Sequence, residues 1–131
     1  MSDASQLKGR TGWRRLVNAA GYSWSGLCSA WRHESAFRQE AVLSLVLLPA
    51  AWAVGTTWVE RGLLMFTVFA MVVVELLNSA IEATVDRVGL DLHPLSKRAK
   101  DLGSAAVLLT LTAGAGVWAM ALWNRWGAWA P

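Results

Sequence analysis

The sequence has little charge, few prolines and almost no cysteine. Only 16% of its 131 residues are charged, and Cys28 is the single cysteine. One cysteine excludes an intrachain disulfide, and no metal-ligand spacing surrounds it. Residues 41–59 and 102–124 contain no charged side chain, and residues 62–77 contain Glu75 alone. Together with a hydrophobic content of 55%, this distribution excludes a typical soluble domain of this size.

Each of the three apolar stretches is close to the ~20 residues that a helix needs to cross the hydrocarbon core of a bilayer. A soluble three-helix bundle would need a polar outer face on every helix, and these stretches lack one. The sequence therefore predicts an all-α membrane protein that forms a single domain over residues 1–131. We expect transmembrane helices at about residues 38–58, 62–88 and 96–124.

Residues 13–35 have the pattern of an amphipathic helix that lies in the membrane surface. Apolar residues recur at three- and four-residue steps from Trp13 to Trp31, whereas Arg14 and Arg15 lie off that stripe. Tryptophans at headgroup depth and arginines toward water are typical of such helices. A helix that serves only as an anchor is the alternative. Because residues 1–15 lack an apolar core and a small-residue cleavage site, we expect no removable signal peptide.

The basic residues are unevenly placed along the chain. Six precede residue 41 and four lie between the second and third apolar stretches, whereas only Arg61 and Arg125 lie on the other side. Because basic residues favour the cytoplasmic side, we expect the N-terminus to lie inside the cell and the C-terminus outside. The net charge of +3 is then explained by topology and acidic lipid headgroups, and no nucleic-acid partner is expected.

A row of polar side chains interrupts the second apolar stretch. Glu75, Asn78, Glu82 and Asp86 follow one another by three or four residues and so share one helix face. Glu75 lies roughly 21 Å beyond Arg61 along a helix, within the cytoplasmic leaflet, and Glu82 lies roughly 31 Å beyond it, at the surface. A carboxylate at mid-membrane depth costs about 2.5–3.5 kcal/mol, so the row is a functional-site hypothesis. A carboxylate that only bonds a neighbouring helix is the alternative.

The predicted cytoplasmic end gathers carboxylates and cations. Carboxylates such as Glu34 and Glu82 provide the oxygen ligands that Mg²⁺ prefers, although a surface pair with Arg38 is an alternative role for Glu34. Arg15 and Lys100 suit a polyphosphate. A base in the lipid layer above them would complete a site for phosphoryl transfer from a nucleotide to a lipid hydroxyl. None of the sequence signatures of soluble kinases occurs in the chain.

Four stretches, at residues 19–24, 36–40, 74–87 and 98–107, carry a resemblance to a known family. The most specific is Glu-Leu-Leu-Asn-Ser-Ala-Ile-Glu at residues 75–82. Over about residues 13–123 the chain resembles the small bacterial integral-membrane diacylglycerol kinases. The resemblance implies a homotrimeric bundle with one surface helix and three transmembrane helices per subunit, and active sites shared between subunits. Pro49, Lys97 and Asn18 depart from the family pattern outside these stretches.

The resemblance also implies roles for individual residues. Glu75 matches the catalytic base that acts on the lipid hydroxyl, and Glu34 and Glu82 match the ligands of the Mg²⁺ that is held with ATP. Contacts with ATP are implied for Arg15, Tyr22, Glu34, Glu82, Asp91, His93, Lys100 and Asp101. Positions that line the lipid site are implied for Ala19, Trp24, Trp31, Gln39, Glu40, Glu75, Asn78, Ser104 and Trp118.

The activity that the resemblance implies is ATP-dependent phosphorylation of diacylglycerol to phosphatidic acid by direct in-line transfer. Undecaprenol kinase is an alternative, because relatives with the same fold and much the same motif phosphorylate that alcohol. A non-catalytic transporter or channel subunit is a third interpretation, in which Glu75 would couple ion movement. That interpretation assigns no role to Glu34, Lys100 and Asp101.

Overall fold

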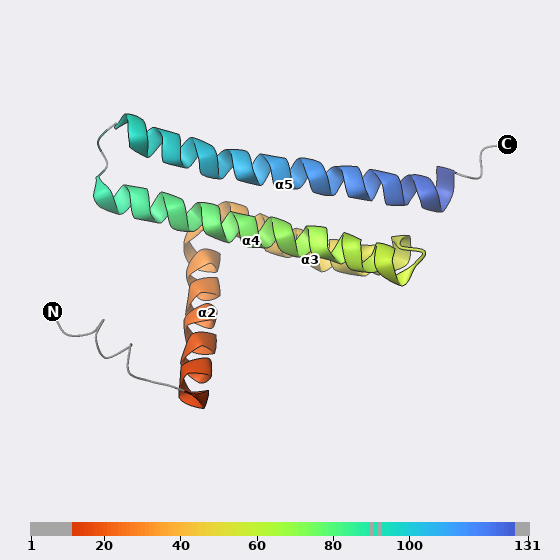
Figure 1. Cartoon of the computed structure of the whole chain (residues 1–131), viewed down its shortest axis with the longest axis horizontal. Coiled ribbons are helices and arrows are strands. Elements are labelled where there is room, and N and C mark those ends of the chain that lie inside the picture. Colours follow the sequence, from red (N-terminus) through yellow and green to blue (C-terminus); the bar gives the residue numbers. More distant parts are fainter. Residues whose placement is uncertain (1–11, 90, 92, 128–131) are drawn as a thin grey trace. The chain divides into compact units, whose positions relative to one another are not determined.

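The computed structural model of the protein describes residues 12–127, apart from residues 90 and 92 (Figure 1). In this part of the chain the regular structure consists of four α-helices: α2 (Trp13–His33), α3 (Ser35–Val54), α4 (Trp58–Val88) and α5 (Pro94–Trp126). The chain divides into two compact units, residues 1–34, which contain α2, and residues 35–131, which contain α3, α4 and α5. The predicted all-helical architecture is confirmed.

α2 ends two residues before the expected boundary at residue 35. Glu34 leaves the helix with extended backbone angles (φ −108°, ψ 111°), and its backbone N–H donates to Ala30 O at 2.8 Å. Arg32 and His33 occupy the last turn, where positive charge interacts favourably with the helix dipole. The end of α2 is therefore defined by local backbone geometry.

The C-terminal end of α4 and the N-terminal end of α5 are marked by residues that favour helix termini. Gly89 follows α4, and its N–H donates to Val85 O at 3.3 Å. Pro94 is the first residue of α5, a position at which a backbone N–H would have no acceptor within the helix, so proline loses no hydrogen bond there. The His93 side chain caps the helix by accepting a hydrogen bond from Leu95 N–H at 3.2 Å. The loop between these helices is thus bounded by a glycine and a proline, as helix-capping preferences predict.

α3 ends at Val54, earlier than the expected end at residue 58. Gly55 follows it, and the carbonyl oxygen of Gly55 accepts from Arg61 Nε at 2.9 Å. The Arg61 guanidinium also lies 4.7 Å from the ring centre of Trp52 and so covers the end of α3. Trp58 is consequently the first residue of α4 rather than the last residue of α3.

α4 is the central helix of the second unit. It packs against both α3 and α5, which contact each other far less, and Figure 1 shows α4 and α5 side by side and antiparallel. The buried core near the α3–α4 turn is formed by Ala51, Val54, Leu64 and Ala121, with Met65, Val117 and Trp118 packed against it. Because lipid tails are as apolar as these side chains, close packing rather than water exclusion must hold them together in a bilayer.

All three helices of the second unit are long and apolar enough to cross a membrane, which confirms that prediction. α4 has 31 residues and α5 has 33. At 1.5 Å per residue they extend about 46 and 50 Å, beyond the ~30 Å hydrocarbon core. The ends of both helices can therefore extend into the headgroup region.

Replacing Gly55 with alanine should destabilise the α3–α4 turn. A Cβ atom there would lie 2.9 Å from Arg61 N and 3.0 Å from Ala51 O, and neither backbone atom can rotate away. Such overpacking costs about 1–3 kcal/mol and would lower the midpoint of thermal unfolding in detergent. Gly62→Ala is the control, because open space surrounds that position and alanine favours a helix by about 0.5–1 kcal/mol. Equal midpoints for the two variants would contradict this account.

Candidate functional site

The buried face of α4 changes from apolar to polar along the helix. Its buried side chains recur every three or four residues, in the order Leu64, Val68, Met71, Glu75 and Ser79. Only 5% of the surface of Glu75 is exposed. Glu82 follows Glu75 by seven residues on the same continuous helix, so the two lie within about 20° around the axis and about 10 Å apart along it. One side of α4 thus carries a buried carboxylate and, nearer the α4–α5 loop, a second and more accessible one.

Glu40 of α3 lies close to the buried carboxylate. Its charge interacts with that of Glu75, and its Oε2 atom is buried without a hydrogen-bond partner. The Ser79 hydroxyl, one turn beyond Glu75, is also buried and unpaired. Packing between apolar helices requires none of these polar atoms, and unsatisfied buried groups need a separate explanation. This excess of polar groups marks the α3–α4 contact around Glu75 as a candidate functional site.

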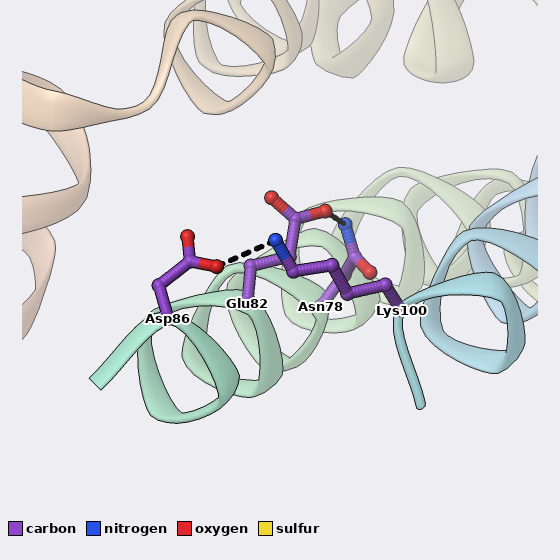
Figure 2. Close-up of polar contacts among 4 residues, drawn as sticks. All are labelled: Asn78, Glu82, Asp86 and Lys100. Atoms are coloured by element: carbon purple, nitrogen blue, oxygen red, sulfur yellow. Dashed lines mark hydrogen bonds and ion pairs between the residues drawn. The ribbon is translucent and has the colours of Figure 1, made fainter. Parts of the chain in front are cut away.

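Polar side chains of α4 and α5 meet near the α4–α5 loop, as Figure 2 shows. Asn78 Nδ2 donates to Glu82 Oε1 at 3.1 Å, and Lys100 Nζ donates to Asp86 Oδ1 at 2.6 Å. The Lys100 ammonium group also interacts electrostatically with Glu82. A lysine of α5 therefore lies within reach of the charges of two α4 carboxylates.

A cavity of about 460 Å³ lies beside this group, between the end of α4 and the start of α5. Its volume is within the range of small-molecule sites. Its lining includes four of the residues expected to contact ATP: Asp91, His93, Lys100 and Asp101. The structure therefore brings together the expected nucleotide contacts from the loop and from α5.

Two ion pairs line the cavity and leave its lysines available to a ligand. Lys97 Nζ lies 2.5 Å from Asp101 Oδ2, and Lys100 Nζ lies 2.6 Å from Asp86 Oδ1. All four side chains are at least 40% exposed. Exposed ion pairs contribute little to stability, so the phosphate groups of a ligand can replace the carboxylate partners.

The chemistry of Glu82 fits a metal ion that is shared with a nucleotide. Among the residues that the structure describes, no three His, Cys, Asp or Glu side chains gather around one point. Mg²⁺ commonly uses only one or two carboxylates, with phosphates and water as its other ligands. Glu82, hydrogen-bonded by Asn78 and one turn before Asp86 of the cavity wall, would suit such a ligand role. Glu34 belongs to the first unit, and its part in the same site stays a prediction.

The expected site residues of α2 fall on two faces of that helix. Arg15, Ala19 and Tyr22 recur at steps of four and three residues and share one face. Trp24 and Trp31, expected at the lipid site, lie on the opposite face, and both are exposed within the first unit. What these five residues contact in the second unit stays a prediction.

The remaining expected lining residues do not form one group. Gln39 of α3 and Ser104 of α5 are exposed. Trp118 lies further along α5, where its Nε1 donates to Thr67 Oγ1 at 3.1 Å. It lines an apolar groove of about 230 Å³ to which Met71 of the Glu75 face also contributes. Trp118 therefore belongs to the apolar part of the bundle, away from the α4–α5 loop.

Ser79 and Gly103 lie beside the polar row of α4, although the sequence pattern predicts no role for either. The position of Ser79, four residues after Glu75, is a signal that points to the same helix face. Gly103 of α5 is buried against Asn78, a contact that depends on how two helices pack. No local signal in the sequence indicates that contact.

Comparison with known proteins identifies the family of this chain. The prokaryotic diacylglycerol kinase family matches residues 21–122, which include every expected site residue except Arg15 and Ala19. The diacylglycerol kinase of Pseudomonas aeruginosa is 51% identical over 118 residues, 90% of this chain and 96% of the relative. Those of Escherichia coli K12 (48% over 117 residues; 89% and 96%) and Helicobacter pylori 26695 (43% over 126 residues; 96% and 94%) are also similar. The chain therefore belongs to the prokaryotic diacylglycerol kinase family.

Proposed function

We propose that the protein is a lipid kinase that phosphorylates diacylglycerol with ATP and releases phosphatidic acid. The observation that carries this proposal is the position of Glu75 and Glu82 on one side of α4. The first is buried among apolar side chains, and the second lies near a cavity lined by lysines. A membrane alcohol and a water-soluble nucleotide can reach the same side of one helix from different depths. The names of the similar bacterial proteins agree with this acceptor.

Phosphoryl transfer proceeds directly from ATP to the lipid. Glu75 accepts the proton of the lipid hydroxyl as that oxygen bonds to the γ-phosphorus, while the bond to the β–γ bridging oxygen breaks and ADP leaves. Lys100 neutralises charge on the phosphate oxygens. Glu82 and Glu34 hold Mg²⁺, which when bound supplies further neutralisation of the phosphates.

The other expected contacts have a place in this scheme. The family resemblance supports nucleotide contacts for Arg15 and Tyr22 of α2, and the cavity supports such contacts for Asp91, His93 and Asp101. The family resemblance supports contacts with the lipid, not all of them at one point, for Ala19, Trp24, Trp31, Gln39, Glu40, Asn78, Ser104 and Trp118. The apolar groove beside Trp118 and Met71 supports an acyl-chain position below Glu75. These assignments place the reacting hydroxyl between the apolar bundle and the loop cavity.

We further propose that α2 lies in the inner-membrane surface and that the protein is a homotrimer with shared sites. Exposed Trp13, Leu16 and Trp24 support contact of α2 with lipid. Self-association is supported by the family resemblance, and α4 has an apolar face on which another subunit could pack, formed by four exposed side chains: Phe66, Phe69, Val73 and Leu77. ATP is cytoplasmic, so the N-terminus and the α4–α5 loop face the cytoplasm and the C-terminus faces the periplasm.

The acceptor can be tested with purified protein in mixed micelles that contain ATP, Mg²⁺ and one lipid alcohol. We expect phosphorylation of diacylglycerol at a higher kcat/KM than that of undecaprenol, measured as phospholipid formed. A higher value for undecaprenol would make the protein an undecaprenol kinase. If neither lipid stimulates ATP consumption, the protein is not a lipid kinase, and a non-catalytic membrane subunit becomes the better explanation.

Glu75→Gln should reduce kcat by about 10²–10⁴-fold, because the variant keeps the shape of the side chain and loses the proton acceptor. ATP binding and the melting temperature should stay close to those of the parent. Glu60→Gln, at the other end of α4, is the matched control and should keep its activity. Near-normal turnover by the Glu75 variant would remove this residue as the base.

Glu82→Gln should raise the Mg²⁺ concentration that half-saturates activity at fixed ATP, because a neutral amide is a poorer ligand for a hard cation. The KM for diacylglycerol should change little, since the lipid binds at the level of Glu75. A Mg²⁺ titration of the parent, the variant and the Glu60→Gln control measures this effect. An unchanged Mg²⁺ requirement would show that the metal is held elsewhere.

A further inference from the structure

Gly103 is a buried glycine of α5 that lies against the polar row of α4. A Cβ atom at this position would overlap Oδ1 of Asn78 and would also lie 3.7 Å from Cδ1 of Ile81. The Asn78 carboxamide therefore occupies the space that any larger residue at position 103 would need. The absence of a side chain at Gly103 is what allows α5 to pack against this carboxamide.

The two ends of the Asn78 carboxamide have different surroundings. Its Nδ2 donates to Glu82 Oε1 at 3.1 Å, whereas its Oδ1 is buried without a hydrogen-bond partner (Figure 2). A reversed amide would place its oxygen against the Glu82 carboxylate, and two acceptors cannot form a hydrogen bond. The need for a donor at Glu82 therefore explains why the oxygen is left facing Gly103.

Helix packing alone does not explain this arrangement. A buried amide oxygen without a donor is unfavourable, and apolar side chains of similar volume would fill the same space without that cost. The arrangement instead gives Glu82 a neutral donor at one oxygen and leaves its other oxygen, Oε2, directed away from Asn78 (Figure 2). Outer partners of this kind orient carboxylates that bind metals.

We propose that Gly103 is a positioning residue, which confines the Asn78 amide so that it orients the Glu82 carboxylate for the cation of the metal–nucleotide complex. The proposal rests on the role proposed above for Glu82. Gly103 itself touches neither substrate. Its effect passes through one side chain of α4, so a substitution at position 103 should act only while Asn78 is present.

The contact is tested first in metal-free protein, by thermal unfolding in EDTA. Gly103→Ala must displace the Asn78 carboxamide in the parent and should therefore give a lower melting temperature than Gly116→Ala. In an Asn78→Ala background no carboxamide remains to collide with, and the two variants should have equal melting temperatures. Gly116→Ala, on the same helix and with nothing within 4 Å of its Cβ position, is the control and should behave alike in both backgrounds. An equal loss from Gly103→Ala in both backgrounds would overturn the proposed contact.

The positioning role is tested by Mn²⁺ binding with a non-hydrolysable ATP analogue, followed by electron paramagnetic resonance. We expect Asn78→Ala and Gly103→Ala to weaken Mn²⁺ binding about 10–100-fold, as other losses of an outer partner do, and Gly116→Ala to leave it unchanged. A purely structural role would not change Mn²⁺ affinity in folded protein. Even if Gly103→Ala fails to fold, parental affinity in Asn78→Ala would overturn the proposal.

The same titration separates this proposal from the one on which it rests. Weak Mn²⁺ binding by Glu82→Gln together with parental binding by Asn78→Ala would reject the positioning role alone. Parental binding by Glu82→Gln would reject the metal role of Glu82, and the positioning role with it.

Discussion

The burial of one carboxylate in an apolar helix is the constraint on which the rest of the structure depends. Glu75 is 5% exposed and lies on the same face of α4 as Leu64, Val68 and Met71, which pack as they would in any membrane bundle. A charge at this depth is costly, and the bundle adds to that cost by placing Glu40 close by. Packing alone would favour leucine at both positions. The role that we propose for Glu75 explains this cost, because it needs an acceptor of protons at the depth of a lipid hydroxyl.

Much of the fold follows from where charge is missing. The uncharged stretches predict three helices of spanning length. The local backbone preferences of Gly89 and Pro94 explain why α4 ends at Val88 and why α5 begins two residues before the expected residue 96. The end of α3 is harder to predict, because the uncharged stretch continues past Gly55 to Val59. It depends on Arg61, which reaches back from the next helix to Gly55 and Trp52, and a pattern of apolar residues carries no information about such a contact. Trp58 has the apolar character of α3 and the position of the α4 start, so hydrophobicity alone assigns it to the wrong helix.

In the candidate site, too, features within one helix can be predicted from the sequence, whereas contacts between helices cannot. Spacing within one helix is enough to place Glu75, Asn78 and Glu82 on one side of α4. Contacts between helices depend on how α5 is shifted along α4, and neither the Lys100–Asp86 pair nor the fit of Asn78 against Gly103 can be derived from residue spacing. Gly103 has no functional group that would mark it as a site residue. Its proposed role comes from the space that its missing side chain leaves for Asn78. The part assigned to Tyr22 comes from family resemblance alone, and that of Arg15 from its charge and the resemblance, since both belong to the separate unit that contains α2.

α4 is a single helix of 31 residues without a break, and this has a consequence for substrate choice. An unbroken helix is stiff, so the vertical offset between its two acids cannot adjust to the size of a ligand. With the role proposed for Glu75, an alcohol would react when the membrane interface holds its oxygen at the depth of that carboxylate, whatever hydrocarbon chain is attached to it. Selection by immersion depth requires little recognition of the tail. It would allow one small protein to accept lipids that differ widely in chain length and saturation.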